Sequence, residues 1–343
     1  MSYSVALNFE DGLTRVVPMR VNETVADAAY RVGINIPLDC RDGACGTCRV
    51  FCEAGSFDGG DYIEDALTED EAAAGYGLAC QMRTKSDLVL RVAASSDACK
   101  IKAVSTPAQV TSVSMLSETT FAFTVAAQAA VGFLPGQYVS IHVPGTAQKR
   151  SYSFSSPPGG TALEFLVRGI PGGLMSEFLR GAVPGTALEL SGPSGSFYLR
   201  DVKRPLLFLA GGTGLAPFLS MLGRLAAGPA PGQPIHLVYG VTRDADLVLV
   251  PALEAYAARL PGFSFECCVA DEASAAPMRG YVTAFIEPGH LHGGDVDVYL
   301  CGPPPMVDAV RGYFTAQGVT PANFYYEKFS PAGAVTALGE AHH

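Results

Sequence analysis

The residues of this 343-residue chain with the clearest potential for chemistry are cysteines near its beginning. Cys40, Cys45 and Cys48 have the spacing C-x4-C-x2-C, and Cys80 follows at a distance. This spacing is typical of the four thiolates that hold a plant-type [2Fe–2S] cluster. Small residues between the first three cysteines let the backbone wrap closely around a cluster, so that amide N–H groups can point at its sulfurs. The loop therefore predicts a site that carries electrons one at a time.

A four-cysteine zinc site is the alternative for the same residues. Zinc sites usually pair two C-x2-C knuckles, whereas this chain has one knuckle and a solitary fourth cysteine. Cys52 extends the spacing toward a bacterial four-iron motif, but that motif needs a cysteine at Asp42 and a proline at Glu53. We therefore interpret Cys52 as a small packed residue. The zinc alternative predicts a colourless binding protein with degenerate nucleotide folds.

A second set of candidate residues follows a predicted strand over residues 138–143. Arg150 can supply a cation for a pyrophosphate, Tyr152 an aromatic face for a flavin, and Ser153 a donor near the hydride-accepting nitrogen. Because R-x-Y-S is short, a strand end with one surface arginine is the alternative interpretation.

A glycine pair, Gly172 and Gly173, strengthens the flavin interpretation. It opens a predicted helix, whose free N–H groups can bind an anion, and Ser176 can add a hydroxyl donor. Short apolar runs broken by Gly and Pro over residues 108–200 predict an all-β barrel or sandwich, and we assign the antiparallel β-barrel on the resemblance given below.

The turn Gly211–Gly214 lies between a predicted strand over 206–210 and a predicted helix over 217–227. In that context a glycine-rich turn is typical of a pyrophosphate site at a helix N-terminus. Pro217 replaces the third glycine of G-x-G-x-x-G, and proline suits a first helical turn. Strands alternating with helices after residue 201 predict a parallel α/β nucleotide-binding domain.

Arg243 bears on the choice between NADH and NADPH. A 2′-phosphate normally needs cations after the second strand, and here Arg243 stands beside Asp244 and Asp246. Acids repel a phosphate and can bind ribose hydroxyls. The segment therefore favours NADH over NADPH.

A later predicted strand over residues 296–300 leads into Cys301-Gly302-Pro303. Taken alone, Cys301 is more simply an inert buried thiol at a strand end. The chain then ends in Phe324–Phe329 and a tail of about a dozen residues.

These segments resemble known families. Residues 3–95 resemble plant-type ferredoxins, whose fold is the β-grasp. The later motifs resemble the ferredoxin–NADP reductase superfamily, which has the same Gly-Gly-Thr-Gly-x-x-Pro turn and a Cys-Gly-Pro turn beside the nicotinamide. Glu327 and Phe329 resemble that superfamily's terminal Glu-x-aromatic, which implies that the aromatic ring stacks on the flavin while the glutamate orients the reacting groups. Plant-type members carry Tyr at the position of Phe329, and there the aromatic residue is terminal.

The motifs and the resemblance together give the full set of predicted site residues. The predicted FAD contacts are Arg150, Ser151, Tyr152, Ser153, Val167, Arg168, Gly172, Gly173, Met175, Ser176 and Phe329. The predicted nicotinamide nucleotide contacts are Gly212, Thr213, Gly214, Pro217, Arg243, Asp246, Cys301, Gly302 and Pro303. The predicted catalytic residues are Ser153, Cys301, Glu327 and Phe329.

The order of the motifs predicts a multidomain α+β and α/β protein. The predicted boundaries are 1–98 for a [2Fe–2S] domain, 99–107 for a linker, 108–200 for an FAD-binding β-barrel, 201–330 for an NAD-binding α/β domain and 331–343 for a tail.

Composition limits the partners. The net charge is −10, and most of it falls in the first block, which disfavours nucleic acid or an anionic membrane and permits a basic protein surface. No run approaches the roughly 20 apolar residues that span a bilayer. An odd count of nine cysteines without a visible export signal disfavours a disulfide framework and favours the cytoplasm.

The whole order most resembles the reductase component of benzoate/toluate/anthranilate 1,2-dioxygenases. The stretches that carry this resemblance are 150–156, 197–204, 298–302 and 327–329. It implies that NADH reduces FAD, that the [2Fe–2S] cluster takes single electrons, and that a separate Rieske oxygenase receives them in the degradation of aromatic compounds. An acidic rim that includes Asp39, Asp42, Glu64 and Asp65 would steer docking. The alternative partner is a diiron monooxygenase of the phenol or methane type.

Overall fold

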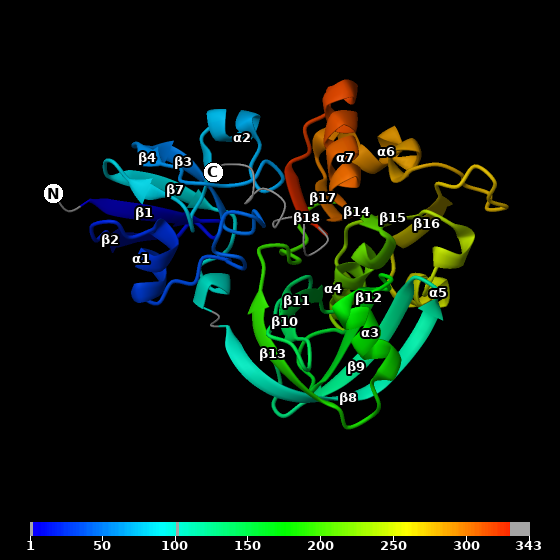
Figure 1. Ribbon diagram of the computed structural model, residues 1–343. Helices are drawn as coiled ribbons and strands as arrows, with labels where there is room; N and C mark the ends of the chain where they lie inside the picture. Colours follow the sequence, from blue (N-terminus) through cyan, green and yellow to red (C-terminus); the bar gives the residue numbers. More distant parts are fainter. Residues whose placement is uncertain (1–2, 101–102, 330–343) are drawn as a thin grey trace, which may run out of the picture. The chain divides into compact units, whose positions relative to one another are not determined.

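The computed structural model describes residues 3–100 and 103–329 (Figure 1). The chain divides into two compact units, one reaching Val104 and including Gly192–Ser196, the other comprising Ser105–Ser191 and the chain from Phe197 onward. The predicted tail 331–343 lies outside the described residues. Among the described residues, no helix is both long and apolar enough to cross a bilayer.

The first unit is built on a five-stranded sheet in the order β2-β1-β7-β3-β5. Its strands are β1 (Ser4–Phe9), β2 (Thr14–Pro18), β3 (Arg49–Ala54), β5 (Tyr76–Leu78) and β7 (Leu88–Val92), with a separate pair β4 (Phe57–Asp58) and β6 (Arg83–Thr84). Its helical elements are α1 (Val25–Arg31), α2 (Glu69–Ala73) and η1 (Ala98–Lys100). Alternate side chains of β1 are buried, as expected for a strand with one face on the core.

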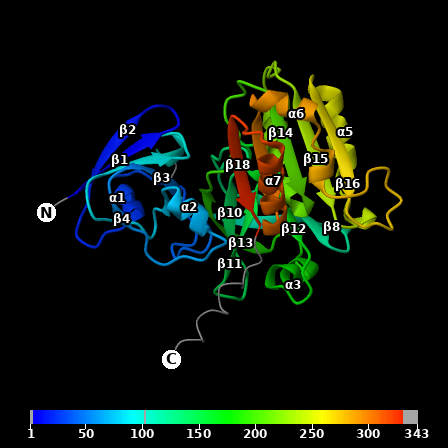
Figure 2. The ribbon, with the colours of Figure 1, turned by 90° about the horizontal axis from the view of Figure 1, so that it is seen from above.

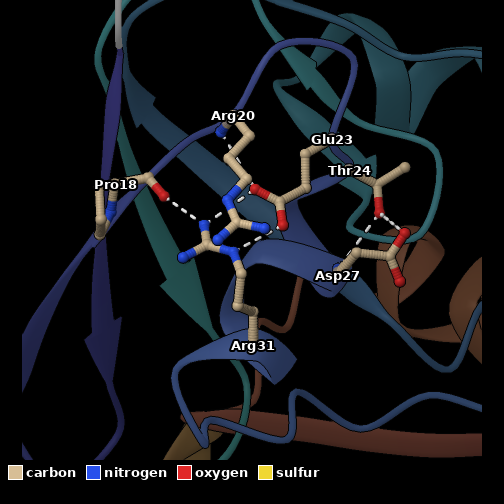
Figure 3. Close-up of polar contacts among 6 residues, drawn as sticks. All are labelled: Pro18, Arg20, Glu23, Thr24, Asp27 and Arg31. Carbon is tan, nitrogen blue, oxygen red and sulfur yellow. Dashed lines mark hydrogen bonds and ion pairs between the residues drawn. The ribbon is translucent and has the colours of Figure 1, made fainter.

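Helix α1 is fixed at both ends by polar contacts (Figure 3). Thr24 caps its first turn, accepting from the Asp27 amide at 3.2 Å. At the other end the Arg31 guanidinium bonds both carboxylate oxygens of Glu23, at 2.8 and 2.9 Å, and the Pro18 carbonyl at 2.6 Å. These bonds from Arg31 lower the pKa of Glu23. The contacts tie the helix to the end of β2, ahead of the cysteine loop.

The second unit contains most of a six-stranded sheet in the order β11-β10-β13-β8-β9-β12, in which the β10–β11, β8–β9 and β9–β12 pairs are antiparallel. The strands are β8 (Val104–Ser117), β9 (Thr120–Ala127), β10 (Tyr138–His142), β11 (Lys149–Ser153), β12 (Ala162–Arg168) and β13 (Ala187–Ser194), and helix α3 spans Leu174–Gly181. Its core contains four phenylalanines in ring contact, Phe123, Phe133, Phe154 and Phe165. Regular structure begins inside the predicted linker, because β8 starts at Val104.

The rest of the second unit is a five-stranded parallel sheet in the order β16-β15-β14-β17-β18. The strands are β14 (Leu206–Gly211), β15 (Ile235–Val241), β16 (Phe263–Val269), β17 (Asp297–Gly302) and β18 (Asn323–Lys328). The helical elements are η2 (Gly212–Leu215), α4 (Ala216–Ala226), η3 (Asp244–Asp246), α5 (Val250–Arg259), η4 (Val282–Phe285), α6 (Pro288–Leu291), η5 (His292–Gly294) and α7 (Pro304–Gln317).

Helices cover both faces of this sheet (Figure 2). Helices α4 and α5 share one apolar cluster with it, and α7 shares another. Burial on both faces explains why β14 and β17 are nearly continuous apolar runs. After β14 the chain adds β15 and β16 on one side of it, and later adds β17 and β18 on the other side. A topological switch point therefore lies between β14 and β17. Ligands of such sheets bind beyond the carboxyl ends of the strands, here at Gly211 and Gly302.

Candidate functional sites

The four predicted cluster ligands meet in the first unit. Cys40, Cys45 and Cys48 lie on the loop between α1 and β3, and Cys80 follows β5. The Ala79 amide donates to the Cys48 carbonyl at 3.0 Å, which brings the fourth cysteine beside the third. Cys48 and Cys80 are buried, whereas Cys45 is exposed.

The thiols form two pairs. Hydrogen bonding between Cys40 and Cys45 raises the pKa of the first and lowers that of the second to about 6. The same effect between Cys48 and Cys80 raises the pKa of Cys48 and lowers that of Cys80 to about 7. Each iron of a two-iron cluster takes two protein ligands. The four thiols, arranged as two pairs, therefore match the ligands that such a cluster needs. Among residues 3–100 and 103–329, no group of three or more His, Cys, Asp or Glu side chains is arranged to hold a single metal ion.

Two glycines let the cysteine loop approach its neighbours. Gly43 has φ +83° and Gly46 has φ +72°, a conformation that residues with a Cβ rarely adopt. A Cβ at Gly43 would lie 2.4 Å from the Asp61 carbonyl oxygen, and one at Gly46 would lie 2.7 Å from that of Ala66. The loop is therefore packed against the segment 61–66, and neither glycine can be replaced without displacing backbone.

Cys52 lies apart from these pairs, where the β3–β7 register shifts between Cys52 and Ala54. Its thiol donates to the Ala54 carbonyl at 3.4 Å, and its side chain is half-buried.

Strand β11 places the predicted flavin residues. Arg150 and Tyr152 are half-buried and Ser153 is buried. The Arg150 guanidinium bonds the Gln148 side chain at 2.5 Å and the Lys149 carbonyl at 2.8 Å. Burial raises the pKa of the Tyr152 phenol. These residues offer the cation, ring and hydroxyl that a flavin dinucleotide requires.

Helix α3 begins at the predicted glycine pair. Gly172 has φ +67°, and the N-cap Gly173 provides no side-chain hydrogen bond, so α3 starts with amides that no cap side chain covers. The Ser176 hydroxyl accepts from the Ile170 amide at 2.8 Å, and this bond shapes the preceding turn.

Four other predicted flavin contacts differ in setting. Met175 and Val167 are buried in the core of the antiparallel sheet, so only their backbone can face a cofactor. Arg168 is exposed at the end of β12. Ser151 pairs its hydroxyl with that of Ser140 at 3.1 Å.

The glycine-rich turn after β14 is a 3-10 turn, η2, and α4 then begins with Pro217 in its first turn. Gly212 has φ +55° with open space around it, which leaves room for a ligand. A Cβ at Gly214 would lie 2.3 Å from the Cys301 carbonyl oxygen. The turn therefore packs directly on the end of β17, and the half-buried Thr213 lies between these two glycines.

The four predicted catalytic residues come together at the carboxyl ends of β17 and β18. Cys301 is register partner to Glu327. The Ser153 hydroxyl, 174 residues away in sequence, donates to the Glu327 carboxylate at 3.2 Å. The Phe329 amide donates to the Gly302 carbonyl at 2.9 Å. Burial, and secondarily the Glu327 charge, raise the pKa of the Cys301 thiol, which therefore stays protonated.

Arg243 and Asp246 meet beyond β15. Their side chains form an ion pair at 3.4 Å, and Asp246 also accepts a short hydrogen bond from Thr119, in the β8–β9 turn. Although burial opposes the shift, the bonds from Thr119 and Arg243 lower the pKa of Asp246. Asp244 accepts from the Ser274 hydroxyl at 2.6 Å. The Arg243 guanidinium is thus paired with the Asp246 carboxylate.

Sequence reasoning missed two residues that connect the sheets of the second unit. Thr119 is one, and Arg200 is the other, with its guanidinium 3.8 Å from the Tyr198 ring centroid and 4.2 Å from that of Tyr325. Tyr325 belongs to β18, the strand that carries Glu327. Thr119 lies in no predicted motif, and Arg200 lies in the stretch 197–204 that carries the resemblance but was given no role. Each acts through a contact that only the fold creates.

Comparisons with known proteins agree with this arrangement. Residues 8–85 match the family model of a 2Fe-2S iron-sulfur cluster binding domain, 107–198 that of an oxidoreductase FAD-binding domain and 208–312 that of an oxidoreductase NAD-binding domain. The chain is 56% identical to the toluate 1,2-dioxygenase electron transfer component of Pseudomonas putida, over 96% of this chain and 99% of that protein. It belongs to the family of dioxygenase electron transfer components.

Other members and solved structures support this placement. The 2-halobenzoate 1,2-dioxygenase electron transfer component of Burkholderia cepacia is 51% identical over 96% of this chain and 99% of its own. A crystal structure of the Amycolatopsis cytochrome P450 reductase GcoB is 31% identical, with a TM-score of 0.71 over 95% of this chain and 99% of its own. As a member of this family, the chain is an oxidoreductase whose cofactors are a [2Fe–2S] cluster, FAD and NAD.

Proposed function

We propose that this chain is the NADH-dependent reductase of a benzoate-type 1,2-dioxygenase system in the degradation of aromatic compounds. The observation that carries the proposal is the meeting of Ser153, Cys301 and Glu327 beyond a nucleotide-binding turn, in a chain that also holds two cysteine pairs. When bound, NADH supplies a hydride, FAD accepts it, and the cluster releases the electrons singly.

The protein's own residues position the hydride transfer in this proposal. Glu327 accepts from the Ser153 hydroxyl and so fixes the side chain predicted to face the flavin. Cys301 contributes a neutral thiol, since its raised pKa keeps anionic sulfur out of the site. Phe329, tethered through its amide to Gly302, would cover a bound flavin and give way to the nicotinamide, as the resemblance implies. The glycine turn at Gly212 and the start of α3 receive the two pyrophosphates.

We assign NADH rather than NADPH on the state of Arg243. Its guanidinium is paired with Asp246, so little of its charge is available to a 2′-phosphate. The acids on either side, Asp244 and Asp246, would also repel a 2′-phosphate.

The proposed electron acceptor is a Rieske-type oxygenase in the cytoplasm. Asp39, Asp42, Glu64 and Asp65 are all exposed, and acids around a cluster loop would steer a basic partner surface toward it. The relatives named for toluate and 2-halobenzoate dioxygenation support an oxygenase of this class.

The fold assignments that accompany this function are a β-grasp for the first unit and a closed barrel for the antiparallel sheet. A bridge between Phe154 and Phe165 supports closure, because it joins the chain just after β11 to β12, at opposite ends of the strand order.

One alternative acceptor remains, a diiron monooxygenase of the phenol or methane type. The reductase component of the Rhodococcus jostii propane 2-monooxygenase is 32% identical over 91% of this chain, which supports keeping this alternative.

The test is anaerobic reduction of the purified protein by NADH, followed by mixing with candidate oxygenases. We expect flavin and iron–sulfur absorption to bleach with NADH, and the reduced protein to reduce a benzoate-type oxygenase faster than a monooxygenase component. Faster reduction of the monooxygenase would establish the alternative. A colourless protein that carries zinc would overturn the proposal.

A further inference from the structure

Arg49 and Glu71 form a largely buried ion pair beside the cysteine loop. The Arg49 guanidinium bonds the Glu71 carboxylate at 2.9 Å, with side-chain exposures of 18% and 9%. Arg49 directly follows Cys48 and begins β3, while Glu71 lies in the first turn of α2. Buried charges are costly unless each is compensated. The burial of this pair therefore indicates a role beyond general stability.

The same guanidinium also holds the backbone behind the loop. Its second terminal nitrogen donates to the Ala66 carbonyl at 3.0 Å. That carbonyl oxygen is the atom against which Gly46, between Cys45 and Cys48, is packed. Glu71 is fixed in turn, because its other carboxylate oxygen accepts from the Thr68 amide at 3.1 Å in a capping box. The Arg49 guanidinium thus joins helix α2 to the Ala66 backbone, against which the cysteine loop packs.

A second arginine in the loop provides an internal comparison. Arg41 directly follows Cys40, as Arg49 follows Cys48, and it pairs with Asp27 at 3.0 Å. The Arg41–Asp27 pair is exposed, with side-chain exposures of 55% and 53%. Solvent screens exposed pairs strongly and buried pairs weakly. Two arginines at the same sequence distance from a ligand therefore act on the site with different strength.

We infer that Arg49 and Glu71 are positioning residues that fix the loop of Cys45 and Cys48 and set the midpoint potential of the [2Fe–2S] cluster. The inference rests on the proposed function, since it takes the four cysteines as ligands of that cluster. Cluster potentials depend on local charge and hydrogen bonding. Arg49 contributes a cation to the cluster surroundings, and Glu71 neutralises it.

The signs of the expected shifts follow from charge. The reduced cluster carries one more negative charge than the oxidised cluster, so an added local cation stabilises reduction. Glu71→Gln leaves the Arg49 cation uncompensated and raises the midpoint potential. Arg49→Met leaves the Glu71 carboxylate uncompensated and lowers it. The double variant, which carries neither charge, returns toward the wild-type value.

The experiment is an anaerobic spectroelectrochemical titration of the holoprotein, with iron content measured in parallel. The variants are Glu71→Gln, Arg49→Met, the double variant and Arg49→Lys, and Arg41→Met is the matched control. Arg49→Lys keeps the charge but loses the two-acceptor fork. This variant should keep a midpoint potential near that of the wild type while losing its cluster faster on dilution. If Arg49→Met does not fold, this faster loss of cluster provides the measurement.

Opposite shifts in the two single variants, both larger than that of Arg41→Met, establish the inference, because a merely structural role predicts no change of sign. Shifts of the same sign, or shifts no larger than that of the control, overturn it. If the wild-type protein holds zinc or no cluster, the proposed function fails and the inference fails with it. If the wild type is reduced by NADH but all midpoints coincide, the inference alone fails.

Discussion

The cysteine loop and the nicotinamide site are assembled in opposite ways. Three of the four predicted cluster ligands, Cys40, Cys45 and Cys48, come from one short loop. The predicted hydride site joins Ser153 to Glu327 across 174 residues, and it needs two sheets of the second unit to bring them together. One site is shaped by local backbone conformation and the other by tertiary packing.

This difference determines which substitutions should matter. In the first unit, glycines with positive φ and direct thiol pairs shape the site, so the ligands themselves are its sensitive points. In the second unit, the predicted hydride site is shaped by close packing of a turn on a strand end, as at Gly214 and Cys301. A change far from any cofactor can therefore disturb the second site, whereas the first is most sensitive inside its own loop.

The largest expected effect is loss of the cluster in Cys48→Ser. This side chain is buried and paired with Cys80. We expect cytochrome c reduction to fall by more than about 100-fold, since even partners of ligands are worth about 10- to 100-fold in metal affinity. NADH-dependent reduction of ferricyanide through the flavin should persist. Cys52→Ser is the control and should keep its cluster, and its loss there would show that the ligand set is wrong.

The next effect tests the assembled site through Glu327→Ala, which removes the acceptor of the Ser153 hydroxyl. Misplacement of a positioning contact costs about 100-fold in rate, so stopped-flow flavin reduction by NADH should slow by that order. Glu327→Gln retains an acceptor oxygen and should lose less. An unchanged rate in the alanine variant would remove Glu327 from the hydride site.

Two glycines of one turn offer a smaller and sharper comparison. Gly214→Ala forces a methyl group against the Cys301 carbonyl, and overpacking of this kind costs about 2 kcal/mol. Gly212→Ala meets open space and bears only the strain of its φ of +55°, about 1 kcal/mol. Denaturant unfolding should rank the two losses of stability in that order. The larger rise in KM for NADH is expected in Gly212→Ala, because its methyl group occupies the open space proposed for the ligand. Equal costs would mean that the turn can move away from β17.

The same contrast explains what the sequence could predict. The cluster ligands could be predicted from the spacing of the cysteines, and the β14 strand with its glycine turn from a short apolar run and its glycines. Cys301 was predicted only through the family resemblance, and the site roles stay predictions. Helix α1 begins at Val25 directly after the Thr24 cap, which is a local signal of a helix start. The predicted linker over residues 99–107 stays a prediction. The sequence did not show that β8 already starts at Val104, because a strand rich in Ser and Thr has weak apolar alternation.

Contacts between distant segments left no sequence signal. The bond from Thr119 to Asp246 and the stacking of Arg200 between Tyr198 and Tyr325 depend on how two sheets of one unit pack. For the same reason the sequence could not show that Val167 and Met175 are core residues. Their apolar character fits a core and a cofactor pocket equally well.

The smallest expected effect is a loss of stability of the second unit at mildly acidic pH. In the second unit His236 stacks on His290, with ring centroids 3.8 Å apart, bonds the Ser264 hydroxyl at 2.9 Å and lies 3.8 Å from Glu266. Burial, then the charge of His290, lower the pKa of His236 to about 4. The unfolded chain therefore takes up a proton near its ordinary pKa of about 6.5, while the folded chain does not until about 4.

The neutral histidine thus contributes stability that is fully present above the unfolded pKa and is lost as the pH falls from about 6.5 toward 4. Between pH 7 and pH 5.5 we expect a loss of about 1 kcal/mol in the free energy of unfolding of the second unit. In the first unit Glu23, whose pKa is lowered from 4.5, is ionised in both states over this interval and contributes no change. Denaturant unfolding of wild type and His236→Gln at both pH values tests the difference, since the variant should lose less stability. Equal losses in the two proteins would assign the acid sensitivity to other groups.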